Sequence, residues 1–357
     1  MIKYFIKKTI YSFSILFGVI VLIFFLFNIL PGDPTKMLIG QRADVATIEN
    51  IKKDIGLDKP LYKRFMLYIN DVSILSIHNN NPNSSIFLNN NKYNYFKILS
   101  IKGKYIVLKY PYLQRSYQTN KTVTQIISDT FPNTLILSLF SIIIAILIGI
   151  PAGIIAALKK DTFIDNIILV VSVFGMALPS FFAAILIAWF FAFYLGAYTG
   201  LNMSGSLFII DEMGNGQYLE LKNIILPAIT LGIRPLAVII ELTRASFLDE
   251  MTKNYVLTAK AKGLGHYLIV FKHVLINALN PIITAISGWF ASMLGGAVFI
   301  EFIFDWKGIG KIIVDSLEKY DFPVLMGACV FISIIFLLIN LLVDFSYIFI
   351  DPKLRDS

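Results

Sequence analysis

The chain has very little of what most enzymes use for chemistry. Its 357 residues include one cysteine, Cys329, and three histidines. A single cysteine excludes a disulfide within the chain and a cysteine-based metal site, and its place in an apolar run favours buried packing. The histidines, which are His78, His266 and His273, are too dispersed to predict a metal centre. We therefore expect no bound metal and no catalytic residue.

Phosphate-binding and hydrolase motifs are also missing. The sequence has no G-x-x-x-x-G-K-[ST] loop, no G-x-S-x-G and no H-E-x-x-H. We predict that the chain is not an enzyme, that it binds no cofactor of its own, and that its energy source is external. The net charge of +8 does not indicate nucleic-acid binding, because no basic soluble domain is predicted to carry it.

Hydrophobic residues, by contrast, make up 57% of the chain. They gather in runs of about 20 residues or more, each long enough to cross ~30 Å of hydrocarbon as a helix. Backbone N–H and C=O groups in lipid must form hydrogen bonds within their own segment, so we expect helices and not open strands. The sequence predicts an all-α integral membrane protein with six transmembrane helices, at roughly 9–30, 134–158, 167–195, 224–245, 277–300 and 322–350.

Two of these runs allow a second interpretation. The first resembles a secretory signal peptide, but its apolar core, Ile10–Leu30, is longer than the ~7–15 residues of such a segment, and no small-residue cleavage site follows. We expect an uncleaved helix. The third run contains Pro179 and is either one kinked helix or a helix followed by an interfacial turn. We favour one kinked helix, because no polar turn separates two halves.

Lysine and arginine are shared unevenly between the short loops. By the positive-inside rule the richer side is cytoplasmic, which places both termini and the loop after the fourth helix on the cytoplasmic side of the cytoplasmic membrane. The basic residues of the long segment 31–133 do not bear on this comparison, because long loops translocate regardless of charge. The richer side carries Lys3, Lys7, Lys8, Lys159, Lys160, Arg244, Lys253, Lys260, Lys262, Lys272, Lys353 and Arg355, and the other side Lys222, Lys307, Lys311 and Lys319.

Residues 31–133 form the largest polar region, and on this orientation they are extracytoplasmic. Within them, 44–70 has helical spacing, 71–95 is rich in asparagine and predicts a loop, and 96–110 predicts a β-hairpin that turns at Lys102-Gly103. Two interpretations stay open. The segment is either a surface insertion, tolerated because loop-closure entropy grows slowly with length, or a cap that contacts a soluble partner.

Two charges stand out inside the fourth predicted helix. Arg234 sits about ten residues into the run, and an arginine at such a depth costs roughly 2.5–3.5 kcal/mol, so it usually faces protein or a water-filled path. Glu241 follows two turns later on a similar face. Both residues are candidates for a substrate path in which Arg234 attracts a carboxylate. The alternatives are an ion pair with a neighbouring helix and, for Glu241, a place among the lipid headgroups.

The loop between the fourth and fifth predicted helices is long, cationic and broken by glycine. The stretch Asn254–His266 predicts a short helix at 254–262 followed by a bend at Gly263 and Gly265. Such a helix brings Tyr255, Ala259 and Lys262 near one face. It is either a handle that a soluble partner grips or an interfacial amphipathic helix without a partner.

These motifs together resemble the membrane permeases of ABC importers, in particular the B-type subunit of the dipeptide, oligopeptide and nickel branch. The resemblance covers nearly the whole chain except roughly 72–111. It is carried by Leu30-Pro-Gly-Asp-Pro34, Ile55-Gly-Leu-Asp-Lys-Pro60, Leu242-Thr-Arg-Ala-Ser246, Leu294-Gly-Gly-Ala-Val298 with Glu301, Phe304, Trp306, Gly308 and Gly310, and Asn340-Leu-Leu-Val-Asp344 with Asp351-Pro352.

The resemblance implies that the loop after the fourth helix docks on an ATPase subunit. Leu257, Thr258 and Ala259 stand where the family's coupling motif has Glu-Ala-Ala, Gly263 is its glycine, and Ile276 replaces its downstream proline. Contacts that need the glutamate are therefore in doubt. The resemblance implies coupling residues Tyr255, Thr258, Ala259, Lys260, Ala261, Lys262, Gly263 and Leu264.

The resemblance also implies a division of the chain and a set of partners. We expect a tail and first helix in 1–30, the extracytoplasmic segment in 31–133 with an insertion at 72–111, a core in 134–350 with the coupling loop at 246–276, and a tail in 351–357. The expected partners, besides the lipid bilayer, are a second homologous permease, two ATPases that bind ATP-Mg, and an extracytoplasmic substrate-binding protein.

The function implied is peptide import by alternating access, driven by the ATPases. Nickel or glutathione import on the same scaffold is the nearest alternative. A proton-coupled secondary transporter is an alternative of a different class, and it predicts titratable carboxylates in mid-membrane and an internal repeat.

Overall fold

The computed structural model describes residues 2–29, 59–82, 84–90, 92–101, 103–210 and 216–350. The chain divides into two compact units. The first comprises 1–12, 130–311 and 332–357, and the second comprises 13–129 and 312–331. The motif at 30–34, most of the motif at 55–60, the predicted helical stretch 44–58 and the tail 351–357 lie outside the described residues.

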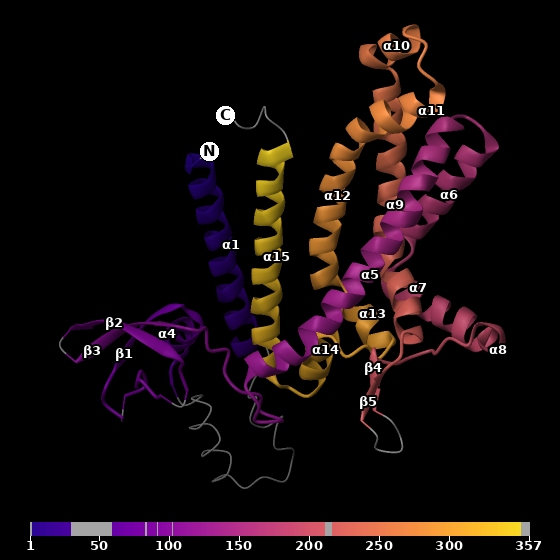
Figure 1. Cartoon of the computed structure of the whole chain (residues 1–357). Coiled ribbons are helices and arrows are strands. Elements are labelled where there is room, and N and C mark those ends of the chain that lie inside the picture. The colour runs from indigo at the N-terminus through magenta and orange to yellow at the C-terminus, as the bar shows by residue number, and fades with distance from the viewer. Residues whose placement is uncertain are drawn as a thin grey trace. The chain divides into compact units, whose positions relative to one another are not determined.

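Helix α9 (Lys222–Met251) is the centre of the first unit (Figure 1). It packs against α12 (Leu275–Gly296), α6 (Phe163–Ala177) and α7 (Ser180–Ile187). Helix α5 (Val123–Leu158) begins in the second unit and continues into the first, where its Leu137 joins the core. The shorter elements of this unit are α8 (Gly196–Thr199), β4 (Phe208–Ile210), β5 (Gln217–Leu219), α10 (Asn254–Ala261), α11 (His266–Leu268) and α13 (Val298–Ile303), with π-helices at Ala188–Tyr194 and Ile269–Val274.

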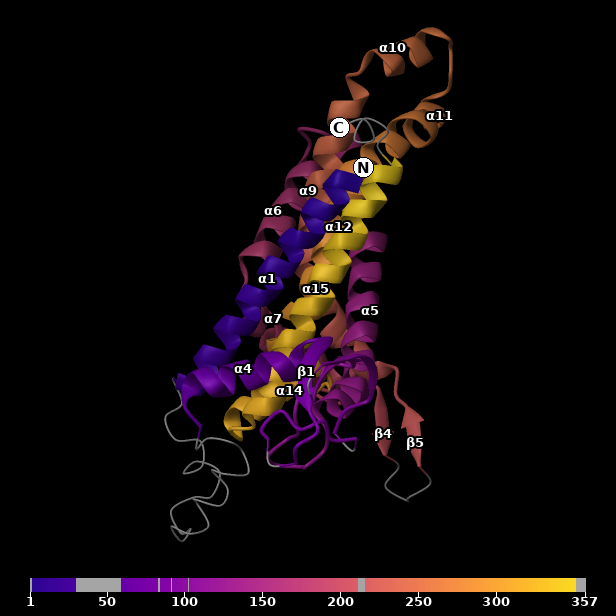
Figure 2. The ribbon, with the colours of Figure 1, turned by 90° about the vertical axis from the view of Figure 1, so that its left-hand side faces the viewer.

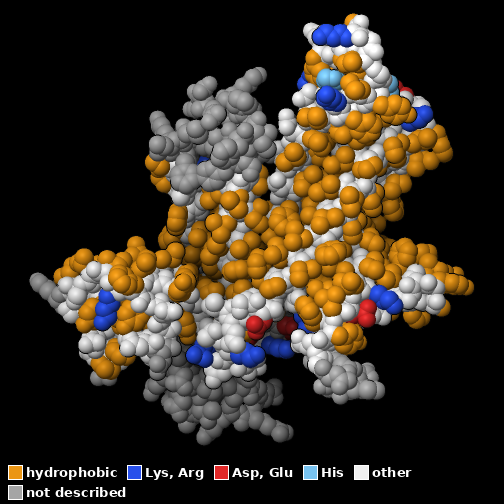
Figure 3. All heavy atoms as spheres, viewed as in Figure 1, with side chains coloured by type: hydrophobic (Ala, Val, Ile, Leu, Met, Phe, Trp, Pro, Cys, Tyr) orange, Lys and Arg blue, Asp and Glu red, His pale blue; other side chains and the backbone are white. Residues whose placement is uncertain are grey.

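The first unit is apolar both inside and outside. Leu137, Ile239, Ile282 and Trp306 are completely buried in its core. Large hydrophobic side chains also cover the outer surface of its helices (Figure 3), and Phe174 on α6 is 65% exposed. An apolar exterior carries no penalty in hydrocarbon, so this distribution fits helices that face lipid.

Five helices among the described residues are long and apolar enough to cross a membrane, and a sixth candidate is a bent pair. The predicted all-α membrane fold is therefore confirmed. The five span Ile6–Ile29, Val123–Leu158, Lys222–Met251, His266–Gly295 and Phe322–Val343. The predicted starts of the second and fifth spans, at 134 and 277, are too late. Both helices begin earlier in the chain, because polar residues near their starts interrupt the apolar run without ending the helix.

The third predicted span is not one kinked helix. Helix α6 ends at Ala177, α7 begins at Ser180, and the two axes differ by 108°. Leu178 is extended there, with ψ of 129°, and Pro179 with ψ of 135° offers no amide proton to continue the helix. An X-Pro step thus broke the run without any polar turn residue, which is why the pattern favoured one helix.

The second unit contains a three-stranded antiparallel sheet. Its strands are β1 (Leu75–Asn79), β2 (Tyr95–Ile101) and β3 (Lys104–Lys109), in the order β1-β3-β2. Helix α4 (Leu61–Val72) precedes the sheet. Residues 13–29 of α1 (Ile2–Ile29), part of α14 (Ile309–Glu318) and the first residues of α15 (Phe322–Ile350) complete the unit (Figure 2).

The predicted hairpin is confirmed, since β2 and β3 pair around the glycine at position 103. The predicted loop at 71–95 is wrong in part, because Leu75–Asn79 forms strand β1 on the far side of β3. Its alternation of Leu75 and Ile77 with Ser76 and His78 is a strand signal that the neighbouring asparagines obscured.

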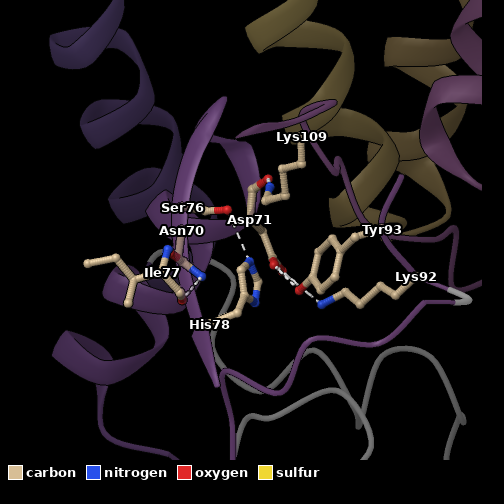
Figure 4. Close-up of polar contacts among 8 residues, drawn as sticks. All are labelled: Asn70, Asp71, Ser76, Ile77, His78, Lys92, Tyr93 and Lys109. Carbon is tan, nitrogen blue, oxygen red and sulfur yellow. Dashed lines mark hydrogen bonds and ion pairs between the residues drawn. The ribbon is translucent and has the colours of Figure 1, made fainter. Parts of the chain in front are cut away.

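One buried cluster holds this sheet on α4. The Asp71 carboxylate accepts hydrogen bonds from the Tyr93 hydroxyl at 2.6 Å and from the Lys92 ammonium at 3.1 Å, and the Lys109 ammonium donates to the Asp71 carbonyl (Figure 4). Burial lowers the pKa of Lys109 to about 8. His78 is fully buried beside Tyr93, and Ser76 lies 3.0 Å from its Nε2.

Candidate functional site

Helix α10 forms a separate short element at the end of α9. Thr252 closes α9, with its hydroxyl donating to the Asp249 carbonyl at 2.7 Å, and Lys253 is extended, so the chain turns before α10 begins at Asn254. At the far end Gly263 has φ of +75°, a left-handed conformation that glycine adopts without strain. The predicted helix and its glycine bend are thus present. Helices α10 and α11 lie together at one end of α9 (Figure 1).

One face of α10 is attached to its own chain. Val256 is completely buried and Ala259 is 7% exposed, in a cluster with Phe247 of α9 and with Val270 and Val274. The Tyr255 hydroxyl donates to Glu250 Oε2 at 2.5 Å, and the Lys253 ammonium lies 2.5 Å from Glu250 Oε1. Partial burial and the Glu250 carboxylate raise the pKa of Tyr255. These contacts fix the orientation of α10 on α9.

The opposite face of α10 is free. The residues of this face that the resemblance assigned to coupling are exposed: Thr258, Lys260, Ala261, Lys262, Gly263 and Leu264. Tyr255 is also 36% exposed, but its hydroxyl is bound to Glu250 on the attached side. Leu257, which is 55% exposed, lies with them. Ala259 was expected near the docking face, but its methyl group packs inside this chain, and it therefore has a packing role here.

Arg234 lines a small cavity in the first unit. The cavity measures about 90 Å³, and its other walls come from α6, α7 and α12, with Gly175, Ser180, Trp289 and Ser292 among the lining residues. The Arg234 guanidinium is exposed and has no ion pair or hydrogen bond within the described part of the chain. Hydroxyl groups and an unpaired guanidinium suit an anionic group.

Glu241 does not join Arg234 at this cavity. Although both lie on α9, Glu241 is half-buried and is not among the lining residues. The spacing of seven residues therefore does not bring the two charges into one site. The alternative role for Arg234 was a structural ion pair, but no carboxylate among the described residues pairs with it.

Sequence reasoning missed a buried ion pair between α6 and α9. Arg244 Nε lies 2.7 Å from Asp165 Oδ1, and Arg244 Nη2 lies 2.7 Å from Oδ2, while the Asp165 side chain is 1% exposed. The Asp161 amide also donates to Asp165 at 3.0 Å. Such a two-pronged pair is strong and directional. The pair was not predicted, because Arg244 was taken as a loop charge and as part of the motif 242–246, and Asp165 lies two residues before the third predicted run.

A second missed feature surrounds Glu301 of α13. Its side chain is completely buried, and Oε2 accepts a hydrogen bond from the Lys311 amide at 3.2 Å. Thr134 of α5 hydrogen-bonds to the same carboxyl group and accepts from the Ile309 amide at 2.8 Å. A side chain on Gly308 would collide with Glu301, since an added Cβ would lie 2.4 Å from Oε2.

The loop 304–311 therefore closes around one buried carboxyl group. Glu301 Oε1 has no hydrogen-bond partner, and burial raises the pKa of Glu301 to about 7, against the opposing effect of its hydrogen bonds. Trp306 Nε1 donates to the Asn133 carbonyl at 3.0 Å, and Asn133 donates to the Lys307 carbonyl at 2.8 Å. The glutamate, tryptophan and glycines that carried the resemblance thus form one structural clasp on α5.

Comparisons with known proteins match the chain along most of its length. Residues 149–356 match the family described as binding-protein-dependent transport system inner membrane component, and residues 1–85 match the N-terminal family of such components. Over 368 residues the chain is 28% identical to the dipeptide transport system permease protein DppB of Alkalihalophilus pseudofirmus, with 99% of this chain and 100% of that protein covered. Over 355 residues it is 33% identical to the glutathione transport system permease protein GsiC of Pectobacterium atrosepticum, with 99% of both covered.

A similar fold occurs in a solved structure of the MetNI methionine ABC transporter in an inward-facing conformation. The TM-score is 0.50 at 15% sequence identity, covering 62% of this chain and 94% of that chain. At this level of identity the likeness concerns the fold alone.

Proposed function

Because this chain belongs to the family of binding-protein-dependent transport system inner membrane components, we propose that it moves di- and oligopeptides through the cytoplasmic membrane. It is a multi-pass membrane permease subunit of an ABC importer, and ATP hydrolysis lies in partner subunits. A substrate-binding protein and ATPase subunits are its partners by family. A secondary transporter driven by protons does not fit this membership.

The observation that carries the proposed coupling role is the two-sided character of α10. Val256 and Ala259 hold one face on the permease, and Leu257, Thr258, Ala261 and Leu264 leave the other face open. Because one face of α10 is packed on the permease, a partner that displaces α10 from its other face also displaces α9 and α12. We assign the free face to an ATPase subunit, with Lys260 and Lys262 placed to meet acidic residues or anionic headgroups.

The complete transporter contains, on this proposal, a second homologous permease and two ATPases that bind ATP-Mg. The cavity at Arg234 supports a shared path, because about 90 Å³ is too small for a peptide in this subunit alone. ATP binding closes the ATPase pair, moves the coupling helices, and rocks the path between inward-open and outward-open states. The termini and α10 are cytoplasmic, as the lysine and arginine bias predicts.

Peptides are favoured as substrate because two relatives are named for dipeptide and glutathione transport. Both substrates carry carboxylates, and Arg234 offers an unpaired guanidinium to such a group. Glutathione, itself a small peptide, is the second candidate. A divalent metal ion such as nickel is less suited to a cavity whose one charged lining residue is an arginine.

The coupling role is tested by crosslinking in the assembled transporter. A cysteine is introduced by Ala261→Cys in a Cys329→Ser background, with Tyr198→Cys as the matched control, because Tyr198 is 88% exposed on α8 at the other end of the same unit. We expect the ATPase to be captured from position 261 in a yield that ATP changes, and not from position 198. Capture from 198 alone, or from neither site in an inserted and intact protein, would refute the assignment.

The substrate class is tested separately in proteoliposomes that contain all subunits and the binding protein. We expect ATP-dependent uptake of a labelled dipeptide or oligopeptide. Uptake of glutathione or nickel without peptide uptake would replace peptides as the assigned substrate and would leave the proposed coupling role unchanged.

A further inference from the structure

The outer face of the sheet in the second unit carries two rows of apolar side chains. Its strand pairing aligns Leu75, Leu108 and Phe96 in one row across all three strands, and Ile77, Ile106 and Leu99 in a second row. Ile106 is half-buried, and the other five are exposed, from 44% for Leu108 to 73% for Phe96. The two rows are called the apolar rows below.

The inner face of the same sheet holds both apolar and polar side chains, and Val107 is completely buried there in a cluster with Leu88 and Tyr93. Ser76, His78 and Lys109 are all buried there, next to Asp71 and Tyr93, while Ile77 points away from this cluster (Figure 4). Antiparallel sheets with one wet face are usually polar on the outer side. Two exposed apolar rows on this side therefore indicate a surface that contacts protein or membrane.

A shallow groove extends the apolar rows. It has a volume of about 480 Å³ and is lined by residues that include Ile74, Phe96, Leu108, Tyr110 and Pro111. Hydrophobic side chains gather over this part of the molecule in Figure 3. Tyr110, at the rim, is 76% exposed. Aromatic rings beside aliphatic side chains are typical of surfaces that lie at the boundary between lipid and water.

The sheet is attached to the end of a membrane-spanning helix. Phe24 of α1 contacts Phe65 and Tyr68 of α4, with ring centroids 5.1 and 5.4 Å apart. The Asn70 side chain of α4 exchanges two hydrogen bonds with the Ile77 backbone of β1, at 2.9 and 3.1 Å. Since α1 has the length and composition of a span, these contacts hold the sheet close to the membrane surface where α1 ends.

The excess of basic residues around the sheet favours anionic phospholipid. Residues 59–122 contain a single acidic side chain, Asp71, and Lys92 is paired with it at 3.1 Å. Among the other basic residues of this stretch, the exposed ones are Lys63, Lys97, Lys104, Arg115 and Lys121. Exposed basic residues in the same unit as an apolar face are complementary to anionic phospholipid, which attracts the lysines and accepts the apolar side chains.

We propose that the apolar rows lie on the leaflet at which α1 ends, among anionic phospholipids, and that they anchor the inserted segment 72–111 to the bilayer. The exposed apolar rows, the contact of α4 with α1 and the exposed basic residues each support this location. The inference does not depend on the proposed substrate or on the coupling role of α10.

The test uses the assembled transporter in nanodiscs that contain phosphatidylglycerol and phosphatidylcholine. A fluorescent label is attached at Leu99→Cys, or at the matched control Ser100→Cys, in a Cys329→Ser background. Leu99 pairs with Ile106 on the outer face, and Ser100, its exposed neighbour, pairs with Tyr105 on the other face. The probes are a phospholipid with a nitroxide high on its acyl chain and iodide in the water.

We expect the lipid nitroxide to quench position 99 severalfold more than position 100, with the reverse order for iodide. Replacing phosphatidylglycerol by phosphatidylcholine, or adding salt, should weaken the lipid quenching. Iodide quenching at 99 equal to that at 100 would overturn the proposal, because the face would then be in water. Protection of 99 from both quenchers would also overturn it, since a protein segment or the binding protein would then cover the face.

Discussion

We predict that the buried carboxyl group of Glu301 makes the stability of this protein depend on pH. We consider the substitution Glu301→Gln, which keeps the size of the side chain and its oxygen acceptor for the Lys311 amide. The amide is neutral at every pH and therefore imitates the protonated acid. The loop 304–311 closes around this side chain, so its protonation bears on the whole clasp with α5.

The magnitude follows from the pKa. Burial raises it from 4.5 to about 7, which at 1.36 kcal/mol per pKa unit corresponds to about 3 kcal/mol. Below pH 4.5 the folded and unfolded chains both hold the proton, and the full stability is present. Between pH 4.5 and about 7 only the folded chain holds it, so the free energy of unfolding falls as pH rises, and it levels off above about 7.

The assay is the free energy of unfolding in detergent micelles between pH 5 and pH 8.5, a window chosen around the pKa of about 7. We expect Glu301→Gln to remove most of the pH dependence below about 7, and to exceed the wild type by about 3 kcal/mol at the alkaline end. Asp305→Asn is the matched control, because Asp305 belongs to the same loop but its side chain is 55% exposed. A variant Glu301→Gln with an unchanged pH profile would refute the reasoning.

Three further predictions concern the first unit. Asp165→Asn should cost about 3–5 kcal/mol of unfolding free energy, because it leaves the Arg244 guanidinium without its partner, whereas the control Asp161→Asn, whose side chain is 81% exposed, should cost little. Gly263→Ala should cost roughly 1–2 kcal/mol locally at its φ of +75° and lower the ATP-dependent crosslinking yield from position 261, an effect that the control Gly265→Ala at φ of −64° should not reproduce. Arg234→Gln should reduce peptide uptake in proteoliposomes with unchanged ATPase binding, and Arg234→Lys should retain part of it; equal uptake by all three proteins would exclude Arg234 from the path.

Local patterns predicted the elements whose formation depends on neighbours in sequence. The apolar runs predicted membrane helices because any such run satisfies its backbone within itself in lipid. The hairpin at 96–110 followed from alternation around Gly103, and the helix at 254–262 followed from spacing that ends at a glycine. These elements need no distant residue to be recognised, and each appears close to its expected place.

Which face of each element is buried was harder to predict. Ala259 seemed suited to docking because it is small, but Val270 and Val274 pack on that side of α10. The same limit applied to β1, whose apolar residues point outward, away from the Asp71 cluster. Burial depends on what lies opposite, and a pattern of spacing does not contain that information.

The sequence by itself determined that this is a multi-pass membrane protein, because hydrophobic length is a local property, and its motifs carried the resemblance to ABC permeases. Only the tertiary structure decided the 108° break after α6, the pair of Asp165 with Arg244, and the burial of Glu301 under the loop 304–311. Asp165 and Arg244 are separated by 79 positions, and Thr134 and Ile309 by 175. Contacts over such separations form only when helices pack, and it is this packing that gives each buried charge its partner and its energy.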